Sequence, residues 1–223
     1  MKQIHLYLPV FAVLSCLPAH VNAQTAVDAS VGFGTGHSKA TGAGIENGSS
    51  GTPFASCAIS SDDSFCQSMP KLDGLFMNLN GDVMFNKHIG VGAGFNFQPG
   101  KSDYGPLRYR QMFIDGNVLY EPISRKRWAL QIQEGIGSAR TGFSFPDSAC
   151  IGTAVCVDQS QSVGTANHFQ WHTGAGVQFL LADHIFFRPQ FDLHYVPNLD
   201  HQFGHNAVPM VMFNIGYTSR GKD

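Results

Sequence analysis

Residues 186–195 read "FFRPQFDLHY", a segment in which two residue patterns interleave. One set is Phe187, Pro189, Phe191, Leu193 and Tyr195, and the other is Phe186, Arg188, Gln190, Asp192 and His194. Because side chains of a strand alternate between its two faces, the segment is predicted to be a strand with one apolar and one largely polar face. In a soluble protein the apolar face would pack inward, whereas in a membrane barrel it would face lipid.

The N-terminus is typical of an exported protein. Lys2 is followed by an apolar stretch over residues 6–17, and residues 21–23 (Val-Asn-Ala) resemble a cleavage site. This pattern predicts a signal peptide over residues 1–23 and one mature domain over residues 24–223. A lipoprotein signal acylated at Cys16 is the alternative. No other stretch approaches ~18 continuous apolar residues, so no transmembrane helix is expected.

The composition is unusual for a soluble domain. Charged residues make up only 13% of the chain, whereas Gly (25) and Phe (18) are frequent. So few charges would hardly cover a surface in water, but a surface in lipid does not need them. The net charge of −2 does not indicate a nucleic-acid partner. No metal or cofactor is expected, since the G-x-G stretches lie within strands and precede no helix.

Eight segments alternate apolar and polar residues with the period of a strand. They are residues 26–36, 74–84, 89–97, 110–120, 128–137, 169–179, 186–195 and 211–217. Glu134 interrupts the apolar set of its segment, and a β-bulge beside it is expected to turn this carboxylate inward. The connections alternate between short turns, such as FNKH and LADH, and much longer links. Outer-membrane barrels show this asymmetry, with long loops outside and short turns in the periplasm.

Four cysteines remain after the signal peptide, and all lie in long links. They form two close pairs, Cys57 with Cys66 and Cys150 with Cys156. In an oxidising compartment these pairs are predicted to be disulfides, and proximity favours this pairing among those that four cysteines allow. A zinc site is the alternative, although the spacings do not match C-x₂₋₄-C.

The residue types on the two faces favour a membrane barrel. The polar faces are rich in Gly, Asn, Gln and Asp, which suits a narrow eight-stranded lumen. On the outside of a soluble barrel, such glycines would weaken the sheet without packing against anything. Aromatic residues near the ends of the apolar faces resemble interfacial girdles: Phe97, Tyr120, Trp128, Phe169, Trp171, Tyr195 and Tyr217. The predicted fold is therefore an all-β, eight-stranded antiparallel up-and-down transmembrane barrel, with a soluble exported barrel that binds an apolar ligand as the alternative.

The chain resembles the small OmpA/OmpX-like outer-membrane barrels of diderm bacteria. The resemblance rests on "IGVGAGFNF" (89–97), "HTGAGVQFLLADHIFFRPQFDLHY" (172–195) and "FNIGY" (213–217), and it covers nearly all of residues 24–217. It implies a bacterial outer-membrane location, a lipid surrounding, and a structural or surface-contact role with a partner reached through the long loops. Such barrels usually end on an aromatic residue, whereas here "TSRGKD" follows Tyr217.

Ionisable side chains gather on the predicted lumen face. They are Asp28, Asp82, Asp115, His172, Arg188, Asp192 and His194. Because a buried charge must be paired, Arg188 is expected to bind one of Asp82, Asp115 and Asp192 and so to plug the lumen. A proton or cation path through the lumen is the alternative.

No enzymatic activity is expected, although barrels resembling the lipid A deacylase and palmitoyltransferase are enzymes. Such sites need a hydroxyl nucleophile beside a histidine and a carboxylate. The deacylase-like His-x-Ser pattern beginning at His194 would require a serine at position 196, where this chain has Val196. The candidate pairs are His37 with Ser38, and His194 with Asp192.

Overall fold

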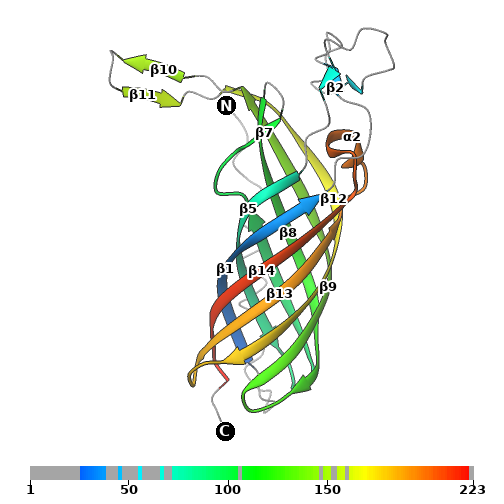
Figure 1. The fold of residues 1–223 in the computed structure, drawn as a ribbon. Helices are drawn as coiled ribbons and strands as arrows, with labels where there is room; N and C mark the ends of the chain where they lie inside the picture. Colours follow the sequence, from blue (N-terminus) through cyan, green and yellow to red (C-terminus); the bar gives the residue numbers. More distant parts are fainter. Residues whose placement is uncertain are drawn as a thin grey trace, which may run out of the picture.

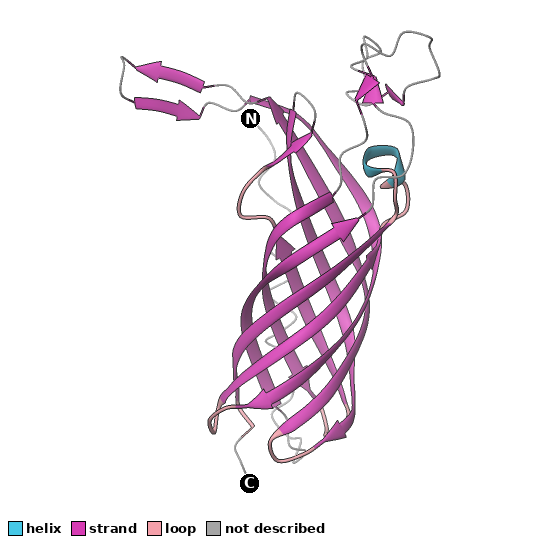
Figure 2. Cartoon of the chain, in the orientation of Figure 1, coloured by secondary structure: helices cyan, strands magenta, loops and turns pink. Residues whose placement is uncertain are grey.

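Eight long strands form a closed ring in the computed structural model, which describes residues 26–38, 45–46, 55–56, 66–67, 72–104, 107–145, 148–151, 155–158 and 161–220. These strands are β1 (Ala26–Ser38), β5 (Leu72–Met84), β6 (Ile89–Phe97), β8 (Leu107–Ser124), β9 (Trp128–Phe145), β12 (Gln161–Leu180), β13 (Ile185–Tyr195) and β14 (Ala207–Thr218). They pair in the order β6-β5-β1-β14-β13-β12-β9-β8, and β8 pairs back to β6. All these pairings are antiparallel, which confirms the predicted up-and-down barrel (Figure 1, Figure 2).

Every predicted segment lies within one of these strands, and the segment 89–97 coincides with β6. Strands β8, β9 and β12 continue beyond the predicted segments toward the long connections. In these extensions the outward positions become polar, as at Arg110 and Arg140, while inward positions such as Tyr109 and Phe143 become aromatic. The contrast that marks a strand in the sequence is therefore reversed there, and the extensions were not predicted.

The two ends of the barrel differ, as predicted. At one end tight turns join the strands, as where Phe85 N donates to Ile89 O at 2.9 Å and Leu181 N donates to Ile185 O at 2.9 Å. The other end carries the long connections and the short elements (Figure 1). These elements are β2 (Ile45–Glu46), β3 (Ala55–Ser56), β4 (Cys66–Gln67), β7 (Ser102–Tyr104), the hairpin of β10 (Ser148–Ile151) and β11 (Val155–Asp158), and helix α2 (Asp200–Phe203).

The outward face of the ring is apolar, and we call it the apolar band. Phe191 on this face is 50% exposed, whereas the inward Arg188 of the same strand is 1% exposed. This arrangement excludes the soluble alternative, in which the apolar set would fill the interior. No helix in the described part of the chain is long and apolar enough to cross a membrane. The band includes Val27, Val31, Phe33, Leu75, Leu79, Ile89, Val91, Ile114, Val118, Tyr120, Ile136, Trp171, Phe179, Phe191, Val211, Phe213 and Ile215.

The bulge expected beside Glu134 is wrong. Glu134 lies opposite Val118 on β8 and opposite Thr173 on β12, and both registers continue unbroken on either side. The Glu134 side chain therefore points outward with the apolar band and is exposed. The register shifts of β9 lie nearer its ends, where β8 shifts between Tyr120 and Ile123 and β12 between Ser162 and Gly164.

Candidate functional site in the barrel lumen

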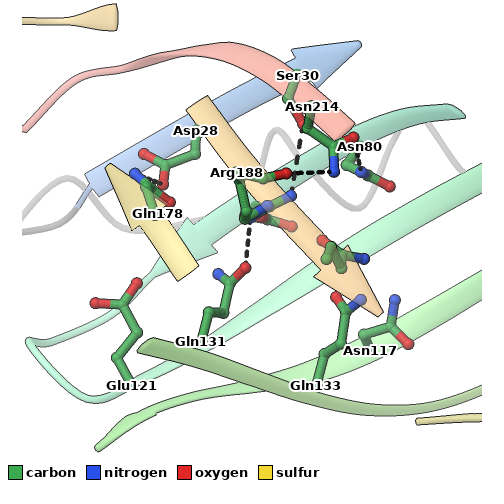
Figure 3. A network of polar contacts seen from close by, with 12 residues as sticks. Asp28, Ser30, Asn80, Asn117, Glu121, Gln131, Gln133, Gln178, Arg188 and Asn214 are labelled. Atoms are coloured by element: carbon green, nitrogen blue, oxygen red, sulfur yellow. Dashed lines mark hydrogen bonds and ion pairs between the residues drawn. The ribbon is translucent and has the colours of Figure 1, made fainter. Parts of the chain in front are cut away.

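Arg188 lies at the centre of the lumen and binds one of its three predicted partners. Its Nη1 donates to Asp82 Oδ2 on β5 at 2.9 Å and also to Gln131 Oε1 on β9, while Nη2 lies 3.5 Å from Ser30 Oγ on β1. Figure 3 shows the guanidinium of β13 among these side chains. The backbone oxygen of Arg188 accepts a hydrogen bond from Asn214 Nδ2 at 3.1 Å. Four strands besides its own thus hold this one residue in place.

The other two carboxylates surround His172 instead of Arg188. The His172 Nε2 atom lies 3.0 Å from Asp192 Oδ1, and Nδ1 lies 3.4 Å from Asp115 Oδ1 and 2.8 Å from Asn117 Oδ1. Both ring nitrogens thus face acceptors, which is the hydrogen-bonding pattern of a charged imidazolium. His194 stacks on His172 with ring centroids 4.6 Å apart. This second centre is a histidine pair enclosed by two aspartates.

A third polar centre closes the end of the lumen at the tight turns. Arg220, just after β14, donates to both carboxylate oxygens of Glu121 at 2.8 and 2.9 Å. It also lies 4.0 Å from Asp28, which accepts a hydrogen bond from Gln178 at 3.3 Å. Burial lowers the pKa of Arg220, but the hydrogen bonds and the charge of Glu121 outweigh it and hold the pKa above its usual range. Sequence reasoning missed Arg220 and Glu121, because both lie outside the alternating segments.

Apolar side chains close the opposite end of the lumen, and we call them the apolar cap. Phe203 of α2 packs edge-on against Tyr104 and Tyr109, with ring centroids 5.4 and 4.9 Å apart. The Tyr104 hydroxyl donates to the backbone oxygen of Gln202. Inward apolar residues on the strands were the signal for this cap, although the lumen face was expected to be polar. The cap consists of Leu72, Phe76, Tyr104, Leu107, Tyr109, Phe113, Ala139, Phe143, Val196, Leu199, Phe203, Val208, Met210 and Met212.

The structure separates the candidate catalytic pairs from the membrane edge. His37 is exposed on the outward face, whereas its neighbour Ser38 is 1% exposed and points inward. Asp192 and His194 share the lumen face, and neither is exposed to lipid. In the described part of the chain no three His, Cys, Asp or Glu side chains gather into a metal site.

The predicted cysteine pairs lie in regions where the structure describes only part of the backbone. In the β10–β11 hairpin, Cys150 lies directly opposite Cys156 in the register. Cys66 belongs to β4, and Cys57 lies outside the described residues, as does the predicted signal peptide. Both disulfides and the signal peptide remain predictions.

A closed antiparallel ring with an apolar outside and charges inside defines a transmembrane β-barrel. The chain belongs to the family described as outer membrane protein beta-barrel domain, whose model matches residues 10–218. Its location is accordingly the bacterial outer membrane. No curated protein matches the chain in sequence.

Two solved structures are similar to this chain in fold. One is Ail, the attachment invasion locus protein of Yersinia pestis, in complex with the heparin analogue sucrose octasulfate; it has a TM-score of 0.51 and 14% identity, over 88% of this chain and 99% of that chain. The other is Neisserial surface protein A, with a TM-score of 0.51 and 8% identity, over 86% of this chain and 96% of that chain. At these identities the likeness concerns the fold alone.

Proposed function

We propose that this protein is a non-enzymatic and non-conducting barrel that presents its outer end for contact with molecules at the cell surface. The observation that carries the proposal is the occupied lumen. An ion would have to pass the apolar cap, then the His172 and Arg188 centres, and finally the pair of Arg220 and Glu121. Buried, hydrogen-bonded charges are costly to separate, and an apolar constriction resists hydration, so each layer opposes conduction.

The positions of the candidate pairs support the absence of catalysis. A nucleophile that acts on lipid must reach the outer rim of the barrel, but His194 stacks on Phe113 inside it, with ring centroids 4.3 Å apart. His37 and Ser38 face opposite sides of the wall and cannot form a dyad. We expect the mass spectrum of lipid A to be unchanged when the protein is expressed. A new lipid A species that depends on His37 or His194 would contradict the proposal.

The outer end presents cations above the apolar band. Arg110 donates from Nη2 to Pro99 O at 3.1 Å and from Nε to Gly100 O at 3.4 Å, which fixes its guanidinium. Arg140 lies on the adjacent strand, also facing outward. Lys101, Arg110, Ser144 and Ser162 line a pocket of about 200 Å³. Fixed cations beside hydroxyl groups suit sulfate or phosphate groups of a surface ligand, and the complex of Ail with a heparin analogue supports a sulfated glycan as the first ligand to test.

The test compares heparin binding by the folded protein in detergent with that of Arg110→Ala/Arg140→Ala. We expect the double variant to bind several-fold more weakly, and binding by the wild type to weaken as salt is added. The control is Arg125→Ala/Lys126→Ala, which removes two exposed cations from a tight turn at the other end. Equal binding by both double variants would contradict a contact through this outer surface.

We further propose that disulfides close the outer connections. The register of Cys150 and Cys156 supports this, since cysteines directly opposite in antiparallel strands have the Cα separation that a disulfide needs. We expect the mature protein, unfolded without reductant, to resist thiol labelling until a reductant is added. Labelling of all four cysteines before reduction would contradict the proposal.

A further inference from the structure

Glu134 is a carboxyl group on the lipid-facing side of the barrel. On its own strand Ile132 and Ile136 lie on either side of it along the outward face, and Ile136 is 58% exposed. Across the wall its neighbours are Val118, 59% exposed, and Thr173. Among the residues that the structure describes, no other acidic side chain is enclosed in this way by the apolar band.

The one hydrogen bond that the structure gives this carboxyl comes from Thr173. The Thr173 Oγ1 hydroxyl donates to Glu134 Oε1 at 2.5 Å. Within the described chain Oε2 has no hydrogen-bond donor, and lipid tails offer none. Ionisable groups in a membrane are costly unless they find a polar partner, so an outward carboxyl that is retained at this place indicates a contact outside the chain.

The wall around Glu134 is low in relief. Gly116 and Ala175 are its outward diagonal neighbours, and both are exposed. A Cβ atom placed on Gly116 would meet nothing within 4 Å, so the surface is open there. Large aromatic side chains cover much of the rest of the band. Small residues in membranes allow close approach of another protein and thereby short polar contacts.

We propose that Glu134 and Thr173 form a contact between two copies of this chain in the membrane. Copies inserted in the same orientation are related by a two-fold axis along the membrane normal, and such an axis brings a residue against its own equivalent at the same depth. Glu134 is suited to that position because a carboxyl group with a proton both donates and accepts hydrogen bonds. Two Glu134 side chains can therefore satisfy each other, whereas a partner with an apolar wall leaves both unsatisfied.

Cysteine cross-linking in lipid vesicles tests this contact. Ile136→Cys lies beside Glu134, while the control Val31→Cys lies on β1, on the opposite side of the ring. We expect oxidation to yield a covalent dimer with Ile136→Cys and none with Val31→Cys beyond the level given by the native cysteines. In the same background Glu134→Leu is expected to lower the dimer yield about tenfold, the size of one polar contact in a membrane.

Glu134→Gln provides the matched control, because an amide also donates and accepts and can pair with its own equivalent. We expect this variant to retain the dimer. All variants are compared after folding is verified by heat-modifiable migration in detergent, and Glu134→Leu is expected to fold because leucine suits a lipid-facing position. Equal dimer yields for Ile136→Cys and Val31→Cys, or a yield that Glu134→Leu leaves unchanged, would overturn the proposal.

Discussion

Arg188 Nη1 lies 2.9 Å from Asp82 Oδ2, although the two residues are 106 positions apart in the sequence. Strands β14 and β1 separate β13 from β5 in the ring, so this ion pair spans the lumen. Both side chains are almost entirely buried, at 1% and 5% exposure. The pair therefore ties two walls of the barrel together from within.

Removing the guanidinium is expected to destabilise the barrel strongly. Arg188→Ala leaves Asp82 buried without its cation, which costs about 3–5 kcal/mol of unfolding free energy. Urea titration of the protein folded in detergent measures this loss. The double variant Arg188→Met/Asp82→Leu replaces the pair with apolar groups and should recover most of it. A single variant with the wild-type midpoint would show that the ion pair does not contribute.

The residues after β14 are expected to stabilise the periplasmic end. Arg220→Ala breaks both hydrogen bonds to the fully buried Glu121, and a loss of about 2 kcal/mol is expected for bonds between charged groups. Arg125→Ala at an exposed turn is the matched control and should unfold like the wild type. If both variants unfold at the same urea concentration, Arg220 does not hold this end closed.

The apolar cap is expected to hold α2 in place. Phe203→Ala removes a ring packed against Tyr104 and Tyr109, and core truncations of this kind cost about 3–5 kcal/mol. Because the loss is local to the outer end, limited proteolysis should cleave the connection over residues 196–206 faster than in the wild type. His205→Ala, an exposed change in the same connection, serves as control. Equal cleavage rates would contradict the packing role of Phe203.

Alkaline pH is expected to loosen the same cap. Burial raises the pKa of the Tyr104 phenol, because the phenolate would lose its hydration. The unfolded phenol titrates near pH 10, below the folded one, so its stabilising contribution is complete below about pH 10 and declines as the pH rises further. Tyr104→Phe should weaken this dependence, as urea midpoints at increasing pH would show. The same pH dependence in the wild type and Tyr104→Phe would exclude Tyr104 as its source.

Much of the barrel could be predicted from local sequence, because each lipid-facing strand alternates and each end has its own connection length. The partner of Arg188 could not, since three carboxylates shared its face and the choice depends on how eight strands are staggered around the ring. The inward aromatic residues Phe76 and Phe113 were visible in the pattern. Their assembly with α2 into a cap depends on tertiary packing, which periodicity does not report.

Glu134 shows a different limit of the sequence. An acid among apolar residues of one strand face can mean a bulge or an outward carboxyl, and the two look the same in one dimension. Only the registers with Val118 and Thr173 decide between them. The cations of the outer end were missed for a related reason, since beyond the apolar band the outward positions become polar.

Ion conductance in planar lipid bilayers tests the closed lumen most directly. We predict that the folded wild-type protein gives no discrete conductance steps, because the apolar cap and the pair of Arg188 and Asp82 both block the path. Phe203→Ala/Arg188→Ala, which opens both layers, is the variant in which steps are expected if it remains folded. Reproducible steps of uniform size from the wild-type barrel would contradict the account.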